Sequence, residues 1–428
     1  MSRIKIKNFG PIQEGFLEND GWMDVKKVTV LIGDQGTGKS TVAKLISIFS
    51  WLEKTLFKKF VSVEQLNIQV FKSLCKQQEL EEYFSENSFL GYEGDAFKFE
   101  CDVTKNKFKG EACHIECSRY ILPKIQYVSA ARNLLTILYS IPSQSDFIEK
   151  QGAFINRDTI PFMVKDLSNE YWKALAELAK NGFPLPVKDT SVYHKNHNTF
   201  VKTKGKDIQM SSASSGIQSI TPLLLVSHFL SEEVKKEILD KVQKISDSVK
   251  NQIVLDIAKD NKSLAEKFVQ LCNFGKDILP QAEDRKLLSE KLKKYIPSSF
   301  MNIVEEPEQN LFPNSQQKLI NSLIEYNNST EGNRLIISTH SPYILSSLNN
   351  SILAGEVFEK TGKSIDAYGK ENRVAFADVS AYQLDNGRIY DIKDYETNLI
   401  NAEAIDRCSD VINSDFDQLL DLMPDNEA

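Results

Sequence analysis

A short glycine-rich stretch near the N-terminus carries the clearest chemical pattern in the chain. Residues 33–41 read Gly33-Asp34-Gln35-Gly36-Thr37-Gly38-Lys39-Ser40-Thr41, with the spacing G-x-x-x-x-G-K-S. An apolar β-branched run precedes this stretch and helical spacing follows it, so the glycines fall at a strand-to-helix turn. Such a turn aims successive backbone N–H groups, and the positive end of the next helix, at one anion. We therefore expect residues 33–41 to bind a nucleoside triphosphate, with Lys39 on the phosphates and Ser40 on Mg²⁺.

Two adjacent acids end a second apolar run. Met301 to Val304 has the character of a buried strand, and Glu305 and Glu306 follow it directly. Adjacent side chains of an extended chain point in different directions, so the two carboxylates can divide two tasks. One can hold the hydration shell of Mg²⁺ while the other polarises the attacking water. A surface turn that merely contains two acids is the alternative interpretation.

Two further stretches could reach a phosphate. His340 follows the apolar run 335–339, and parallel strands bring their carboxyl ends to one edge of a sheet. Residues Ser214, Ser215 and Gly216 open a helix, where hydroxyl and N–H groups favour an anion. The chain already has one phosphate loop, so a second anion site needs another ligand. A phosphate bound by a partner subunit would be such a ligand. A structural histidine and a simple serine helix cap are the alternatives.

The elements that must position these residues alternate between strands and helices. We expect strands at 4–9, 27–32, 96–103, 107–117, 125–129, 301–304, 334–339, 373–384 and 388–392, and a hairpin at 192–210. We expect helical segments at 40–60, 62–85, 133–182 with an internal loop, 214–230, 231–295, after 313, and to about 423. This pattern indicates an α/β protein with helical insertions.

Composition limits the class of protein. The chain has 428 residues with 41% hydrophobic and 26% charged content, which is ordinary for a globular protein. Its length suits two or three domains, or one large α/β domain with insertions. It has neither an apolar N-terminal leader nor a run of about 18 apolar residues, so we expect a cytoplasmic protein without a membrane partner. The net charge of −7 gives no general attraction to nucleic acid, although the acidic C-terminal end leaves the remainder nearer neutral.

Two pairs of residues have spacing that could suit a metal ion. They are Cys113 with Cys117 and His194 with His197. Neither pair has visible partner ligands, so reduced cysteines in a strand and a solvated loop are the favoured interpretations.

Taken in order, the motifs resemble those of ATP-binding-cassette ATPase heads of the SMC and DNA-repair type. They are most similar to the overcoming-lysogenization-defect branch and its relatives among bacterial defence ATPases. The resemblance covers residues 1–350 and rests on five stretches, 6–12, 33–41, 214–218, 305–313 and 338–343. It implies an α/β ABC-ATPase head, in which a mixed N-terminal β lobe joins a parallel-sheet P-loop core with helical insertions. The implied parts are an N-terminal ATPase lobe at 1–135, a helical insertion at 136–190, a hairpin and signature helix at 191–230, a helical arm at 231–297 and a C-terminal ATPase lobe at 298–428.

The resemblance also assigns roles to the motif residues. Lys39 and Ser40 would be Walker A residues, and Glu305 would be the Walker B metal ligand, where transport relatives usually have Asp. Glu306 would be the general base and His340 the switch histidine. The signature acting in trans would be Ser214, Ser215 and Gly216.

Two further residues are weaker candidates for the nucleotide site. Gln126 lies in the region of the family's Q-loop glutamine, but inside the strand rather than after it. Arg132 follows the same strand and could contact phosphate or a partner; an ordinary arginine at a helix end is the alternative. The implied cofactors are ATP and Mg²⁺, bound in a homodimer that closes head to head over two ATPs.

Nuclease members of that branch append a metal-dependent TOPRIM domain, and this chain departs from them. After Pro342 only the segment Tyr343 to Ala428 remains, without the buried strand-end acids of a two-metal nuclease. We therefore expect an ATPase with no intrinsic nuclease, which scaffolds or controls a separate effector, a nuclease, in anti-phage defence. The alternative is a stand-alone DNA-binding repair-type ATPase that grips phosphates through lysines at 195–206 and 286–294. Because the net charge is negative, a solvated charged face is the favoured interpretation of these lysines. A transporter subunit is disfavoured by the segment 231–295 and by the position of Gln126.

Overall fold

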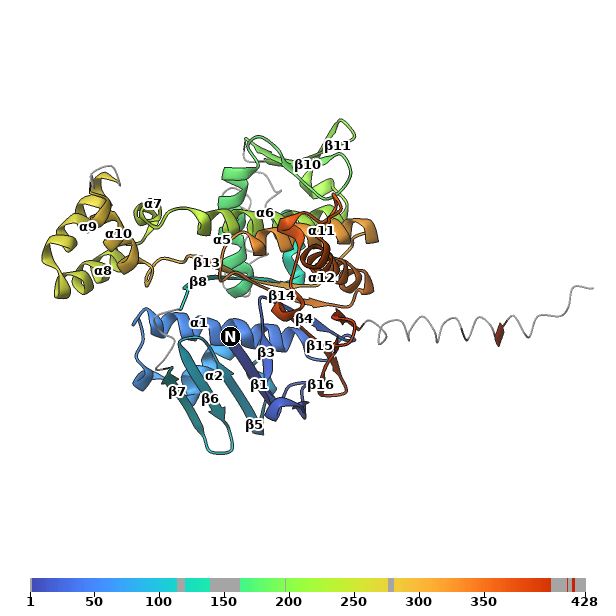
Figure 1. The fold of residues 1–428 in the computed structure, drawn as a ribbon, viewed down its shortest axis with the longest axis horizontal. Coiled ribbons are helices and arrows are strands. Elements are labelled where there is room, and N and C mark those ends of the chain that lie inside the picture. Colours follow the sequence, from blue (N-terminus) through green and yellow to red (C-terminus); the bar gives the residue numbers. More distant parts are fainter. Residues whose placement is uncertain are drawn as a thin grey trace, which may run out of the picture.

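The computed structural model describes residues 2–113, 120–138, 162–196, 198–275 and 281–401, together with 414, 418 and 419. Figure 1 shows its layers: an antiparallel sheet, the helix α1, a mainly parallel sheet, a group of helices and a small second antiparallel sheet, with a helical arm at one side. The predicted fold class, α/β with an N-terminal β lobe, a parallel core and helical insertions, is confirmed, although the sheet of the lobe is antiparallel rather than mixed.

Within the described residues, the mainly parallel core sheet has seven strands in the order β2-β16-β15-β4-β14-β13-β8. Their bounds are β2 Gly15–Phe16, β4 Val28–Ile32, β8 Pro123–Val128, β13 Ser299–Glu305, β14 Arg334–Thr339, β15 Val379–Asp385 and β16 Arg388–Asp391. Every residue of β4 and β13 is buried, which explains their continuous apolar runs, because helices cover both faces of a parallel sheet. The sheet takes β4 from the N-terminal part and β13 to β16 from the C-terminal part, so both predicted ATPase lobes contribute to it.

One face of the core sheet packs on α1, Lys39–Phe57, which separates it from the antiparallel sheet β3-β1-β5-β6-β7. The strands of that sheet are β1 Ser2–Phe9, β3 Met23–Val25, β5 Phe84–Glu93, β6 Phe97–Asp102 and β7 Lys107–Ala112, with the helix α2 Ile68–Gln77 against it. Side chains of β1 alternate between buried and partly exposed, as expected of a strand with one covered face. Apolar residues of β1, α1 and the core sheet form one continuous core.

The other face of the core sheet packs on helices that surround α6, Ser215–Lys235. These helices are α3 Asn133–Leu138, α5 Phe162–Leu178, α11 Pro313–Asn328 and α12 Pro342–Thr361. Beyond them lies a small sheet of β9 Phe183–Pro184, β10 Thr190–Lys195, β11 Asn198–Thr203 and β12 Lys206–Gln209. Near the C-terminal end of the described residues, β17 Lys393–Asp394 and β18 Leu399–Ile400 form a two-stranded antiparallel ladder.

The arm leaves the body after α6 and returns to it before β13 (Figure 1). It contains α7 Ile238–Lys241, α8 Asp247–Asp260, α9 Lys262–Phe274 and α10 Ala282–Leu292. Its buried side chains, among them Ile253, Phe268 and Leu288, form a separate apolar cluster. The helical character predicted for 231–295 is therefore confirmed for the described residues of this segment, and the arm is a compact bundle with its own core.

The structure corrects the predicted elements in three places. The segment 62–85 is not one helix, because α2 ends at Gln77 and the strand β5 begins at Phe84. Residues 192–210 contain parts of three strands, β10, β11 and β12, joined by two turns, rather than a single hairpin. His194 therefore lies in β10, where its ring forms a hydrogen bond with Thr199. The predicted strand 373–384 begins only at Val379. Cys117 and His197 lie outside the described residues, as does the acidic C-terminal helix apart from residues 414, 418 and 419.

Candidate functional site

The phosphate loop connects β4 to α1 at the carboxyl edge of the core sheet. The strands β14 and β13 run parallel to β4 in register, so residues that follow them meet the loop at the same edge. Gly38 begins α1 with a left-handed φ of +104°, and Gly33 has a φ of +147°. A Cβ on Gly33 would lie 2.2 Å from the carbonyl oxygen of Leu384, so both glycines are required by backbone geometry.

The Lys39 side chain folds back over the loop. Its Nζ donates hydrogen bonds to the carbonyl oxygens of Gly33, at 2.7 Å, and Asp34, at 2.6 Å. Burial lowers the pKa of Lys39, while the negative charges of Glu306, Asp34 and Glu308 act in the opposite direction. Ser40 is exposed at the first turn of α1. The loop thus presents an ammonium and a hydroxyl group at the beginning of a helix, as a bound triphosphate with a divalent ion requires.

Glu305 ends β13 with its carboxylate held in place by β8. The Tyr127 hydroxyl donates to Oε1 at 2.6 Å, and the Ala130 backbone N–H donates to Oε2 at 3.1 Å. Burial, the largest cause, raises the pKa of Tyr127 well above its ordinary value. The hydroxyl therefore stays protonated and can donate its hydrogen bond to Glu305. Outer-shell donors of this kind orient a metal-binding carboxylate. The residues present at this edge, Ser40 and Glu305, fit the oxygen ligands that Mg²⁺ prefers.

Glu306 lies beside His340 across the neighbouring strand ends. Its Oε1 is 3.5 Å from Nε2 of His340, and its backbone N–H donates to the carbonyl oxygen of Ser338 at 2.8 Å. Glu306 has a left-handed φ of +43°, an uncommon conformation for a residue other than glycine. The backbone changes direction sharply after β13, so the side chains of Glu305 and Glu306 point to different places. The carboxylate of Glu306 lies close enough to Lys39 to interact with its charge.

Glu308 is a residue of this site that the sequence argument did not assign. Its Oε1 accepts the backbone N–H of His340 at 2.7 Å, so it fixes the start of the turn that carries the histidine. Its Oε2 is buried and has no hydrogen-bond partner among the described residues. The sequence signal for Glu308 is its place in the stretch E-E-P-E. That spacing does not predict that Glu308 accepts a hydrogen bond from the backbone of His340.

Arg132 is fully buried, and its guanidinium group binds backbone carbonyls. Nη1 donates to Glu305 O at 2.6 Å, Nη2 donates to Glu306 O at 2.7 Å, and Nε donates to Ser219 O at 3.1 Å. Burial lowers its pKa to about 10, and the three neighbouring glutamates oppose that shift. The guanidinium group therefore connects the two acidic residues to α6.

Gln126 is also buried, inside β8 and opposite Asn302 of β13. Its amide nitrogen donates to the carbonyl oxygen of Tyr127 at 3.2 Å, and among the described residues it forms no hydrogen bond with the phosphate loop. The structure thus places Gln126 in the interior of the sheet, not among the residues that gather at the carboxyl edge.

The predicted signature opens α6 next to the loop that follows the two acids. Ser214 and Ser215 are exposed, and Ser214 makes no side-chain cap to the helix. Gly216 is buried against this loop, since a Cβ there would lie 2.4 Å from Asn310 O. The Ser219 hydroxyl lies 3.1 Å from Oε1 of Gln309 in the same loop. Ser214 and Ser215 therefore lie exposed at a helix end that packs against the loop after the two acids.

Comparison with protein families gives a match to one segment of the chain. Residues 285–345 match the AAA ATPase domain family, a segment that contains Glu305, Glu306 and His340. No curated protein matches the chain in sequence.

Among solved structures, the chain is similar to an SMC head bound to the C-terminal winged-helix domain of ScpA, with 8% identity, a TM-score of 0.37 and coverage of 91% of this chain and 96% of that one. It is similar to an SMC head domain from Thermotoga maritima, with 9% identity, a TM-score of 0.33 and coverage of 91% and 97%. A nucleotide-free ATP-binding cassette from an ABC transporter gives 13% identity, a TM-score of 0.26 and coverage of 91% and 89%.

Proposed function

We propose that this chain is a Mg²⁺-dependent ATPase whose two active sites are completed when two copies meet head to head. The observation that carries the ATPase assignment is the convergence at one sheet edge of the Lys39 loop, the Glu305–Glu306 pair and His340. The match of residues 285–345 to the AAA ATPase domain family supports the same assignment.

The proposed mechanism divides the site between phosphate binding and activation of water. Lys39 leaves the loop carbonyls to bind the β- and γ-phosphates, and Ser40 with Glu305 would hold Mg²⁺. When bound, Mg²⁺ would offset negative charge that develops on the transferred phosphoryl group. Glu306 orients a water molecule for in-line attack and accepts its proton, and His340 contacts the γ-phosphate beside it.

The outward-facing signature supports the dimer. Ser214 and Ser215 lie exposed at the positive end of α6, a place suited to a phosphate. Phe312, 73% exposed on the loop after the acids, and Tyr343, 51% exposed after the His340 turn, give this edge exposed aromatic surface. Aromatic residues are enriched where proteins associate. A second copy would cover this surface and place its Ser215 over the γ-phosphate.

A substitution of the general base tests this function. Glu306→Gln should bind ATP, hydrolyse it about a hundredfold more slowly or worse, and accumulate as a dimer in sedimentation velocity runs with ATP and Mg²⁺. Glu306→Gln combined with Lys39→Ala is the matched control and should stay monomeric. A Glu306→Gln protein that remains monomeric with saturating ATP would count against the head-to-head dimer.

We further propose that the ATP-bound dimer controls a separate effector protein, a nuclease, in bacterial anti-phage defence. The support is the resemblance of the motifs to defence ATPases, together with the ATP-dependent dimerisation proposed above. Affinity capture from native cells with Glu306→Gln and ATP should recover a nuclease that Lys39→Ala does not recover. Recovery of the same proteins by both variants would contradict this role.

The arm does not favour the alternative, a stand-alone DNA-binding ATPase. Lys291 pairs with Asp260 at 2.5 Å, and Lys294 pairs with Asp256 at 3.1 Å. Lys293 pairs with Glu290 at 2.7 Å. Lysines neutralised in this way contribute little to a phosphate-binding surface.

A further inference from the structure

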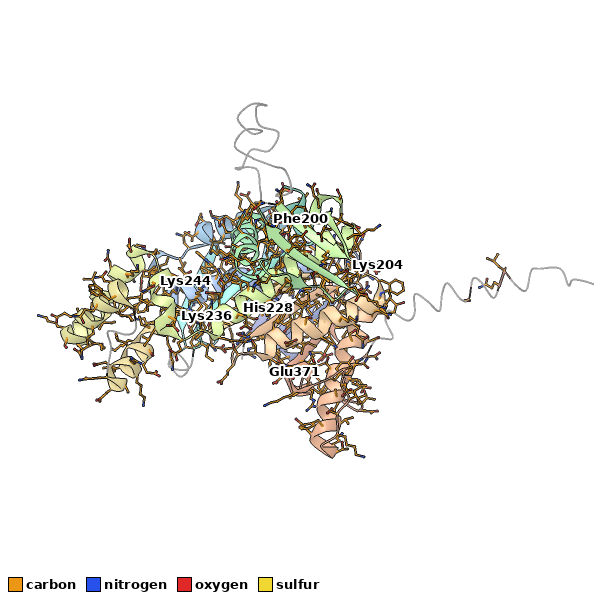
Figure 2. The ribbon with its side chains drawn as sticks, turned by 90° about the horizontal axis from the view of Figure 1, so that it is seen from above. Phe200, Lys204, His228, Lys236, Lys244 and Glu371 are labelled. Atoms are coloured by element: carbon orange, nitrogen blue, oxygen red, sulfur yellow. The ribbon has the colours of Figure 1, made fainter. Side chains whose placement is uncertain are left out.

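A groove of about 750 Å³ lies where the arm joins the ATPase body. It is bounded by α5, by the C-terminal part of α6, by the first turns of the arm and by the segment that leads into β13. Figure 2 shows Lys236 and Lys244 at this junction, on the side of the body from which the arm projects. We call this cavity the arm groove. Its volume lies within the range of pockets that bind small molecules.

Positive charge exceeds negative charge in the lining of the arm groove. The lining lysines are Lys58, Lys124, Lys173, Lys180, Lys241 and Lys244, and the lining acids are Glu170, Glu177 and Glu233. Glu170 pairs with Lys124 at 2.9 Å and with Lys173 at 3.1 Å, and Glu233 pairs with Lys244 at 3.0 Å.

The remaining lysines have no recorded carboxylate partner within the described part of the chain. The Nζ of Lys241 donates to the carbonyl oxygens of Val234, at 2.9 Å, and Pro297, at 3.1 Å. Within the described part of the chain, neither Lys58 nor Lys180 lies within ion-pair distance of a carboxylate. Burial lowers the pKa of Lys58 and of Lys241 to about 8, and the charge of Lys124 adds to the effect at Lys58. An anion in the groove would relieve this excess of positive charge.

The rest of the lining is apolar. Phe229 and Leu230 of α6, with Ile245 and Ile296 from the arm, form an apolar wall beside the lysines. A ligand that fits both parts has an apolar or ring-shaped body and an anionic end. Lysine ammonium groups bind phosphate well as point charges.

We propose that the arm groove binds a small organic phosphate, at a site separate from the ATP site. Three features favour a small ligand over a nucleic-acid backbone: the glutamates interleaved with the lysines, the apolar wall and the limited volume. The helix α6 begins at the signature residue Ser215 and passes the groove at its other end, at Phe229 to Val234. A ligand there would therefore contact the helix that carries the signature.

Pyridoxal 5′-phosphate is a suitable probe, because it has a ring, one phosphate and an aldehyde that condenses with a neutral lysine amine with loss of water. Borohydride then reduces the imine to a stable amine that peptide mass spectrometry locates. We expect Lys58 and Lys241 to be labelled several-fold faster than the exposed Lys293. Inorganic tripolyphosphate should protect them. The same labelling in Lys39→Ala protein separates this site from the ATP site.

Binding of the unreduced probe provides the second measurement. Lys58→Glu combined with Lys180→Glu should raise the Kd for pyridoxal 5′-phosphate at least about tenfold, with the melting temperature nearly unchanged. Lys293→Glu is the matched control and should bind as the wild type does. Equal labelling of groove and surface lysines, or an unchanged Kd in the double variant, would overturn the proposal. Protection by a DNA duplex but not by tripolyphosphate would also overturn it, in favour of a nucleic-acid surface.

Discussion

The Glu305 carboxylate has both oxygens engaged before any metal ion arrives. Tyr127 and the Ala130 N–H hold it from the end of β8, at 2.6 and 3.1 Å. A carboxylate fixed in this way loses little freedom when it binds the hydration shell of Mg²⁺. The hydroxyl of Tyr127 therefore acts as a positioning group for the proposed metal site rather than as a ligand.

Tyr127→Phe removes that hydroxyl and leaves the ring in place. We expect the Mg²⁺ concentration for half-maximal ATPase activity to rise about tenfold or more, because outer-shell partners of metal ligands have effects of this size. Activity at saturating Mg²⁺ should recover most of the wild-type value. Magnesium titrations at fixed ATP provide the measurement, and an unchanged midpoint would show that Tyr127 has no such role.

Glu53 of α1 is a buried acid outside the active site. It accepts backbone N–H bonds from Ala96 at 2.6 Å and Phe97 at 3.2 Å. Burial raises its pKa from 4.5 to about 7. The folded protein therefore holds a proton here that the unfolded chain has lost between these pH values. Its contribution to stability is full below about pH 4.5 and declines as the pH rises towards 7.

Glu53→Gln should remove this pH dependence, because the amide oxygen still accepts both N–H bonds and carries no charge. The wild type should lose stability relative to Glu53→Gln as the pH rises from 5 to 8, by about 2 kcal/mol in the free energy of unfolding. Urea unfolding at several pH values measures the difference between the two proteins. A constant difference across this range would be inconsistent with a raised pKa.

Three elements meet at Arg132, which follows β8 and binds the end of β13 and the first turns of α6. The carbonyl oxygens of Glu305 and Glu306 belong to the segment where the backbone turns through a left-handed residue. A planar guanidinium with several fixed donors can bind such a set of acceptors, whereas a lysine ammonium cannot match its geometry. Arg132 thus connects Glu306, the proposed general base, with the helix that carries the proposed signature.

Arg132→Lys should retain the charge but lose this geometry. We expect kcat to fall about tenfold or more while the KM for ATP changes little, since Lys39 and the loop are not touched. The loss should be much smaller in a Glu306→Gln background, because both changes act through the same residue. If the two substitutions lower kcat by independent factors, Arg132 only stabilises the fold. Arg132→Lys would then lower the free energy of unfolding by about 1–3 kcal/mol for each carbonyl left unpaired.

Much of the molecule's architecture follows from local sequence signals. The β-branched run before Gly33, the apolar runs before Glu305 and His340, and the helical spacing after Lys39 correctly predict β4, β13, β14 and α1. These signals are strong because strands buried on both faces need continuous apolar residues. The strand β5 is missed because Phe84 follows closely on a helical pattern and Gly91 suggests a break, although its partners β1 and β6 stabilise it.

The contacts within the site depend on chain segments that are distant in sequence. Tyr127 meets Glu305 because β8 pairs with β13, and Arg132 meets Ser219 because α6 crosses the same region. No spacing rule connects residues so far apart. The placement of Gln126 in the sheet interior likewise depends on the register of β8 with β13. Sequence patterns therefore predict which residues reach the edge, and tertiary structure decides how they are held.

The proposed active site needs two copies of the chain, and mixing two inactive variants tests this requirement. Lys39→Ala removes the phosphate lysine, whereas Ser215→Arg places a bulky cation at the exposed signature; each protein alone should be inactive. In a mixed dimer, one of the two sites combines an intact Lys39 with an intact Ser215. An equal mixture should therefore regain about a quarter of the wild-type ATPase rate in a symmetric dimer. A mixture that stays at the sum of its two inactive components, although the subunits exchange, would contradict a shared site.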